Sequence, residues 1–209
     1  MLPKIEAFFM KEMKEKTGRL AILSLFLLVP FYPFRIFFLF LLCTHMLGWD
    51  VQHKRYSSLM ALPYMPKQLF WLSYLFLVVI SVETQLIGAA LGAGVFNMGW
   101  APLGIHLLGS LLFVTSYYGI SMLAVTFGLD HFAIPLLVFI VDLTLGGIGF
   151  TTNNPYSLIS PVHQKSLPLA IIPAVALLLG SAYLFEKKGA YHSTFKSKRY
   201  AMPSAQKRF

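Results

Sequence analysis

The chain has 209 residues, of which 57% are hydrophobic and only 12% are charged, and its formal net charge is +9. A water-soluble domain of this length needs far more polar surface, so the composition excludes an ordinary soluble protein and predicts a helical membrane protein. The apolar residues form long blocks, not the alternating segments of about ten residues that a membrane β-barrel requires. The basic residues gather at the ends of these blocks, which is typical of membrane topology signals and argues against nucleic-acid binding.

An amphipathic segment covers residues 1–17. Ile5, Phe8, Phe9 and Met13 fall on one helical face, and charged residues mostly cover the other. This pattern predicts a helix that lies in the membrane interface. The alternative is a cytoplasmic extension of the first membrane span.

Six apolar runs follow, and each is a candidate membrane span: 20–31, 34–49, 68–93, 103–127, 132–150 and 167–185. The first two runs are short, and Pro30 and Pro33 lie between them. They form either one span that is kinked at the prolines, or a tight hairpin of two helices that extend past the membrane surface.

The distribution of charge distinguishes these two possibilities. Of the 17 Lys and Arg residues, 15 lie in the ranges 4–19, 50–67 and 187–208. A hairpin places all three ranges on one side of the membrane, whereas a single kinked span exports the basic tail. Since Lys and Arg concentrate in cytoplasmic segments, we expect six transmembrane helices with both termini in the cytoplasm, and only Arg35 and Lys165 outside.

The chain is thus expected to comprise a membrane domain, 1–188, and a basic cytoplasmic tail, 189–209. The tail is polar and basic with little apolar content. We expect it to be disordered or to lie on anionic lipid.

Between the second and third runs, residues 50–74 read DVQHKRYSSLMALPYMPKQLFWLSY and are polar and basic at their start. Leu59 and Leu62 share a helical face, and Pro63 ends the helix because proline disfavours helical backbone at the residue before it. We expect a short cytoplasmic helix whose leucines fill an apolar groove on a partner, with Lys54 and Arg55 at the rim. The alternative is an amphipathic loop that rests on lipid headgroups.

With six spans and an amphipathic N-terminal helix around it, this segment resembles the coupling segment of ABC-2 type transporter permeases, where a turn of helix ending in Leu-Pro binds the ATPase subunit. The positions that match are Asp50, Tyr56, Ser57, Leu59, Leu62, Pro63 and Lys67. Pro66 and Gln68 depart from the pattern, which has a basic and an acidic residue there.

The resemblance implies the membrane subunit of an ABC exporter in the cytoplasmic membrane of a prokaryote. Two such permease copies, identical or paralogous, would pair in the lipid membrane and bind two cytoplasmic ATPase subunits. ATP and Mg would then be bound by those partners. This chain contains no GxxxxGK[ST] sequence, so we do not expect it to bind ATP, to be an enzyme or to carry a cofactor or metal of its own.

Two acidic residues fall within the predicted spans, Glu83 in the third and Asp142 in the fifth. An ionised carboxylate is costly in hydrocarbon, so both should face the bundle interior or water. They either line a substrate or ion pathway or lock the packing of helices through hydrogen bonds. Candidate partners for them are His45, His106, Tyr117 and Tyr118.

Two further functions stay open from the residues alone. One is an ion- or proton-coupled secondary transporter that uses Glu83 and Asp142. The other is a non-transporting membrane subunit of a larger complex. In the third run, Gly88 and Gly92 form a GxxxG pattern, which predicts a close helix crossing.

Overall fold

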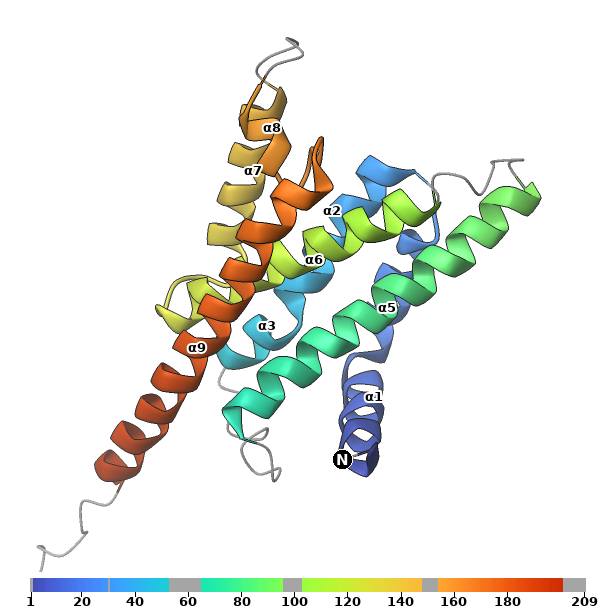
Figure 1. Cartoon of the computed structure of the whole chain (residues 1–209). Coiled ribbons are helices and arrows are strands. Elements are labelled where there is room, and N and C mark those ends of the chain that lie inside the picture. The colour runs from blue at the N-terminus through green and yellow to red at the C-terminus, as the bar shows by residue number, and fades with distance from the viewer. Residues whose placement is uncertain (1, 30, 53–64, 96–102, 148–153, 201–209) are drawn as a thin grey trace, which may run out of the picture.

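The structure, a computed structural model, describes residues 2–29, 31–52, 65–95, 103–147 and 154–200, and its regular structure there is entirely helical (Figure 1). The elements are α1 (Leu2–Leu27), α2 (Tyr32–His45), α3 (Leu47–Gln52), α5 (Pro66–Val95), α6 (Leu103–Thr126), α7 (Ala133–Gly147), α8 (Tyr156–Ile159) and α9 (Leu167–Tyr200).

Four helical stretches are long and apolar enough to cross a membrane: Tyr32–Gln52, Pro66–Gly92, Leu103–Thr126 and Leu167–Lys188. They indicate a helical membrane protein. The predicted run 132–150 corresponds to α7, whose 15 residues reach only about 22 Å against a hydrocarbon core of about 30 Å. The predicted run 20–31 starts within α1, whose last eight residues are 20–27, and continues past the end of this helix at Leu27. Four of the six predicted crossings therefore have helices of sufficient length, and the full count of six stays a prediction.

The N-terminal segment is not a separate helix. α1 runs without a break from Leu2 to Leu27, so it joins the amphipathic residues to the first apolar run. This continuity corresponds to the alternative in which residues 1–17 extend the first span.

The chain reverses direction between α1 and α2. Phe26 stacks on Phe38 with ring centroids 4.6 Å apart, while near the other end of the pair the Arg19 guanidinium lies 4.9 Å from the Trp49 ring centroid. Later residues of α2 and α3 thus meet earlier residues of α1, which is an antiparallel arrangement. The hairpin interpretation of residues 20–49 requires this reversal, and a single kinked span does not have it.

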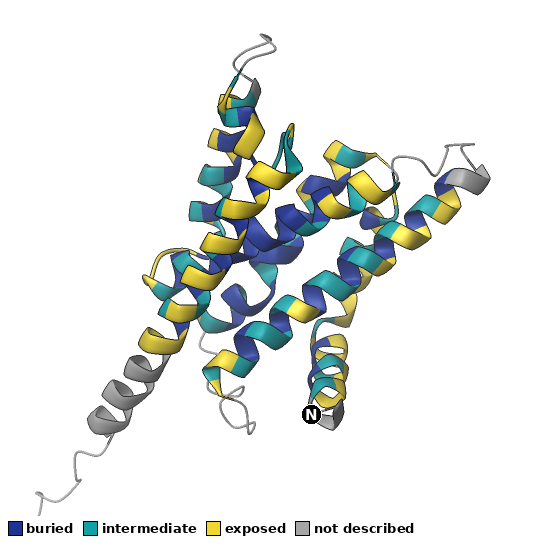
Figure 2. Cartoon of the chain, in the orientation of Figure 1, coloured by how far each residue is buried: buried dark blue, intermediate teal, exposed yellow. Residues whose placement is uncertain are grey.

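Helix α6 lies at the centre of the bundle, and α2, α3, α5, α7 and α9 all contact it. The buried side chains concentrate where α6 meets α2, while α5 and α9 expose much of their surface (Figure 2). α6 and α9 approach closely at Gly119, where a Cβ atom would lie 3.2 Å from the Leu177 backbone. A lipid-facing α9 and a buried α6 are both apolar, because lipid and the bundle interior favour the same side chains.

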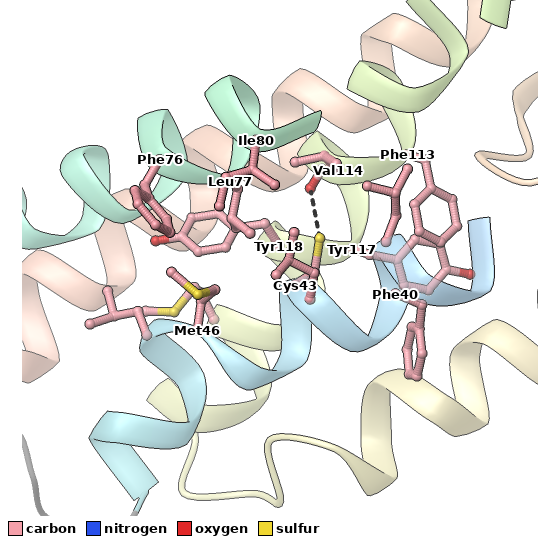
Figure 3. Close-up of a cluster of buried hydrophobic side chains, with 14 of the residues drawn as sticks. Phe40, Cys43, Met46, Phe76, Leu77, Ile80, Phe113, Val114, Tyr117 and Tyr118 are labelled. Carbon is pink, nitrogen blue, oxygen red and sulfur yellow. Dashed lines mark hydrogen bonds between the residues drawn. The ribbon is translucent and has the colours of Figure 1, made fainter. Parts of the chain in front are cut away.

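Buried side chains of α2, α5 and α6 pack together in the core (Figure 3). Helix α7 adds Phe139 to this core, and many of the side chains are aromatic. Phe40 stacks on Phe139 at 4.9 Å, and Phe113 stacks on Tyr117 at 4.4 Å. The Tyr118 hydroxyl donates a hydrogen bond of 2.8 Å to the Phe70 carbonyl, which satisfies the polar end of a fully buried ring. Helices α5 and α7 each pack against α6.

A glycine permits a close approach between α5 and the end of α1. A Cβ atom at Gly88 would lie 2.7 Å from the Leu28 carbonyl oxygen, which is too close for any side chain. The GxxxG pattern thus marks a crossing at its first glycine, as the sequence predicts.

The C-terminal helix is longer than expected. α9 continues through the first part of the predicted tail to Tyr200, whereas the apolar run that predicts this helix ends at residue 185 and the tail is predicted to be disordered or to lie on anionic lipid. Residues 201–209 lie outside the described part of the chain.

Candidate functional site

At one end of the bundle, α3 is fastened to α1 by a buried group of charges. Lys16 Nζ lies 2.6 Å from Asp50 Oδ2 and 2.8 Å from Glu12 Oε2. Both carboxylates are buried and the lysine is nearly so, with 11% of its side chain exposed. A buried lysine needs such partners, since an unpaired charge would be strongly destabilising. The pair therefore constrains α3 to move with α1.

The other end of α3 is hydrogen-bonded to the turn between α6 and α7. Gln52 Nε2 donates to Asp130 Oδ2 at 3.1 Å, and Gln52 Oε1 accepts from the His131 backbone N–H at 2.8 Å. Oε1 also lies in hydrogen-bond contact with His131 Nδ1. One glutamine thus links α3 to two consecutive residues of the turn.

Asp130 also caps the start of α7. Its Oδ1 accepts hydrogen bonds from the backbone N–H groups of Ala133, at 2.7 Å, and Phe132, at 2.8 Å. These bonds, together with the one from Gln52, stabilise the ionised carboxylate and lower the pKa of Asp130 to about 2. The turn is therefore rigidly connected to both α3 and α7.

Rings pack around α3 and complete the contact with its neighbours. Trp49 stacks on His45 with centroids 5.7 Å apart and meets the His131 ring edge-on at 5.1 Å. The Arg19 guanidinium also lies over the Trp49 ring. α3 is thus held by α1, α2 and the α6–α7 turn at once.

The predicted docking residues follow α3 directly. Most of them lie outside the described residues: Lys54, Arg55, Tyr56, Ser57, Leu59, Leu62 and Pro63. Asp50 is buried against Lys16, so its carboxylate is an internal ion-pair partner in this structure. Lys67, at the start of α5, is exposed and lies 3.5 Å from Glu186 of α9. The described residues on both sides of the segment 53–64 are therefore attached to the same end of the bundle.

A second polar group lies within the bundle, around Arg35 of α2. Its guanidinium donates to the carbonyl oxygens of Leu27, at 2.5 Å, and Ser81, at 2.6 Å. It also donates to Ser110 Oγ, at 3.3 Å, and Thr84 Oγ1, at 3.2 Å. No described carboxylate forms an ion pair with it. The Leu27 carbonyl belongs to the C-terminal end of α1, where helix dipoles place partial negative charge, so this end supplies part of the compensation.

The sequence counts Arg35 only as a charge on the outer side, and its role inside the bundle is not apparent from the pattern. The available signal is an arginine at the second position of the apolar run 34–49. Nearby, Tyr32 donates to Gln164 Oε1 at 2.7 Å, and Gln164 Nε2 donates to the Gly109 carbonyl at 2.8 Å. Arg35 therefore lies just inside the end of the bundle that is opposite to α3.

Asp142 of α7 is buried and surrounded by hydroxyl groups. It accepts hydrogen bonds from Tyr117 at 3.1 Å, Tyr156 at 2.8 Å and Ser160 at 2.6 Å. Of the four residues expected as partners, Tyr117 is the one that reaches it. The three donors come from α6, α8 and the residue after α8, so the carboxylate joins these segments to α7.

Glu83 has a different environment. Its side chain is exposed on α5 and points away from the bundle, on the side opposite to Ser81 and Thr84. The structure therefore does not bring Glu83 and Asp142 together in one site. Neither His45, which bonds to the Leu41 carbonyl, nor His106, which packs on Tyr32, contacts either carboxylate.

Among the described residues, no group of three or more His, Cys, Asp or Glu side chains is placed to hold a metal ion. No family model, curated protein or solved structure matches the chain. The resemblance to ABC-2 permeases therefore depends on residues 50–74 and on the predicted topology.

Proposed function

We propose that this chain is the membrane subunit of an ATP-driven ABC-2 type exporter, powered by a separate cytoplasmic ATPase that binds the segment around Leu59 and Leu62. The observation that carries the proposal is the attachment of this segment at both sides. Gln52 precedes it and is bonded to the α6–α7 turn, and Lys67 follows it and contacts α9. A segment held in this way transmits a displacement to the whole bundle.

The coupling follows from the rigidity of α3. The helix has only six residues, and Asp50 within it is bound to Lys16 of α1. When two ATPases approach each other on binding ATP, they push the coupling segment, and α3 carries the push to α1 and to the α6–α7 turn. The Lys16–Asp50 contact is short and buried, and Gln52 makes two hydrogen bonds to the turn, so the helices shift as rigid bodies and do not bend locally.

The ion-coupled alternative has less support. A secondary transporter that uses Glu83 and Asp142 needs both carboxylates on one pathway. Asp142 is enclosed by three hydroxyl groups, and Glu83 is exposed on a different helix. A non-transporting subunit would need no attachment between the cytoplasmic segment and the bundle.

The test is whether an ATPase binds to the predicted segment. The full chain is purified in mild detergent from its own membranes, and co-purified chains are screened for a P-loop sequence and for ATP hydrolysis. We expect such an ATPase with the wild-type chain. In Leu59→Asp, a charge in the apolar groove should reduce its recovery at least about tenfold, since burying an unpaired charge costs several kcal/mol.

The matched control is Leu129→Asp. Leu129 is 48% exposed in the α6–α7 turn, at the same end of the bundle but outside the predicted docking set. Recovery of the ATPase with the control and not with Leu59→Asp supports the proposal. Equal recovery with both variants would assign the segment to the lipid surface, and equal loss would place the contact elsewhere on this end.

A further inference from the structure

Glu83 is a charged residue on the outer face of a helix that is long enough to cross a membrane. The candidate span on α5 is Pro66–Gly92, whose midpoint is residue 79. At a rise of 1.5 Å per residue, Glu83 lies about 6 Å from that midpoint along the helix axis. The hydrocarbon core extends about 15 Å to either side of its centre, so the carboxyl group lies well inside it.

No described residue of the same chain compensates this group. Glu83 makes no hydrogen bond and no ion pair with any described residue, in contrast to Asp142 with its three donors. Arg35 contacts the same turn of α5, but on the opposite face, through Ser81 and Thr84. Its guanidinium is occupied by four hydrogen bonds and is buried, so it cannot turn toward Glu83.

The surface around Glu83 is apolar and belongs to one stripe of α5. Leu75, Leu86, Ile87 and Leu91 lie on it and are between 41% and 51% exposed. Such residues are equally suited to lipid and to a packed helix, so on their own they do not identify a partner. The Glu83 carboxyl group indicates what the partner must supply, because a polar side chain in lipid associates with another polar side chain at the same depth.

We propose that two copies of this chain pack against each other along this stripe of α5, with the two Glu83 side chains hydrogen-bonded across the interface. A twofold axis along the membrane normal places the same residue of both copies at the same depth, so each Glu83 meets a group of identical chemistry. A carboxyl group that holds a proton donates one hydrogen bond and accepts another, and the pair therefore satisfies itself.

A second copy fits better than a cationic partner for a structural reason. The exposed side chains named on the stripe besides Glu83 are aliphatic, so they offer a larger foreign head group no second polar contact. This inference deepens the proposed function, in which two permease copies pair. Its test does not involve the ATPase, so either proposal can fail without the other.

The association is measured in lipid vesicles. Copies of the full chain are labelled with donor or acceptor fluorophores at Lys187→Cys, and energy transfer is followed as lipid is added. The native Cys43 is fully buried and does not compete for the label. We expect the wild-type chain to form dimers. Glu83→Leu should lower the association constant about tenfold, while Glu83→Gln, which also donates and accepts, should stay within about threefold of wild type.

Cross-linking locates the contact. Leu86→Cys lies one turn from Glu83 and should form a disulfide-linked dimer on oxidation, whereas Ile172→Cys, which is 67% exposed on α9, should not. Because Glu83 is exposed, Glu83→Leu removes no internal contact and should fold normally. Unchanged energy transfer in Glu83→Leu, equal cross-linking at position 172, or a cross-link from position 86 to a different chain would each overturn the proposal.

Discussion

At the scale of single residues, Arg35 and Asp142 are two buried charged residues that are compensated by dipoles, whereas the buried Lys16 group is compensated by opposite charges. Arg35 is bonded to two backbone carbonyls and two hydroxyls, and Asp142 to three hydroxyls. Hydrogen bonds to a charged group contribute about 1.5 to 3 kcal/mol each, so several of them can offset the cost of burial. The geometry of the acceptors around Arg35 and of the donors around Asp142 then matters more than the sign of the charge alone.

The first prediction concerns Arg35. Arg35→Lys keeps the buried charge but has one nitrogen in place of three, and it cannot reach Leu27, Ser81 and Ser110 together. We expect it to lower the free energy of unfolding by about 2 to 4 kcal/mol. Arg35→Met removes the charge as well as the hydrogen bonds, and it should lower the free energy of unfolding by no more than Arg35→Lys does.

Thermal unfolding in one detergent, followed by tryptophan fluorescence, compares the three chains. The control is Lys14→Met on the exposed face of α1, which should have the same melting temperature as wild type. A lysine variant as stable as wild type would show that the fixed geometry of the guanidinium is not required.

At the scale of elements, α3 is too short to be stable as an isolated helix and is formed by its contacts. Helices shorter than about 12 residues are marginal in water, and α3 has six. Lys16, Gln52 and the rings around Trp49 supply the missing stabilisation. The capping of α7 by Asp130 belongs to the same group of contacts. The start of α7 and the end of α3 therefore both depend on the turn between α6 and α7.

The second prediction concerns the pH dependence of this turn. The pKa of Asp130 is about 2 in the folded chain, below its ordinary value of about 3.9. A lowered folded-state pKa means that the carboxylate stabilises the fold above about pH 4, and that this contribution disappears as the pH falls from about 4 toward 2. Asp130→Ala should therefore be less stable than wild type at pH 7, by about 1 kcal/mol for the lost cap.

The measurement is the difference in melting temperature between wild type and Asp130→Ala at several pH values in detergent. Asp130→Asn is the matched control, because it can cap the helix but does not titrate in this range. The difference in melting temperature between wild type and Asp130→Ala should shrink below pH 4. The difference between Asp130→Asn and Asp130→Ala should stay the same over this pH range. If wild type and Asp130→Ala differ in melting temperature by the same amount at pH 3 and pH 7, the ionised Asp130 carboxylate does not stabilise this helix start.

At the scale of the whole molecule, the structure divides into two ends. Lys16, Gln52, Asp130 and Glu186 lie at one end, as their contacts to α3 and α5 show. The Tyr32–Gln164 contact lies at the other, beside the start of α6. The first end contains Lys16 and Lys67, which the charge distribution predicts to be cytoplasmic.

The third prediction is the orientation of these ends. Single cysteines are introduced at Phe31 and Lys165 for the outer end and at Lys14, Leu129 and Lys187 for the inner end, all of which are exposed. A membrane-impermeant maleimide should label only the first two in intact cells, and all five after the membrane is opened. The unsubstituted chain, whose Cys43 is buried, is the control. Labelling of position 187 in intact cells would contradict the six-span topology.

Much of the fold is determined by local sequence. The apolar runs are long, so the helices around 34–49, 68–93 and 103–127 could be predicted close to their observed bounds, and the start of α9 at Leu167 could be predicted although its end at Tyr200 could not. Pro33 marks the start of α2, because proline is tolerated in the first turn of a helix and not in its interior. The positions of Lys and Arg predict a reversal between the first two runs, which the antiparallel contacts of α1 with α2 and α3 display.

Only the tertiary structure decides which face of each helix points inward. In a water-soluble protein the polar face identifies the surface, but here the lipid-facing and the buried faces are both apolar, so the sequence carries no such signal. For this reason Glu83 and Asp142 look alike in the sequence, yet one is exposed and the other buried. The pairing of Lys16 with Asp50, 34 residues apart, likewise depends on how the packed helices are rotated, which no local pattern encodes.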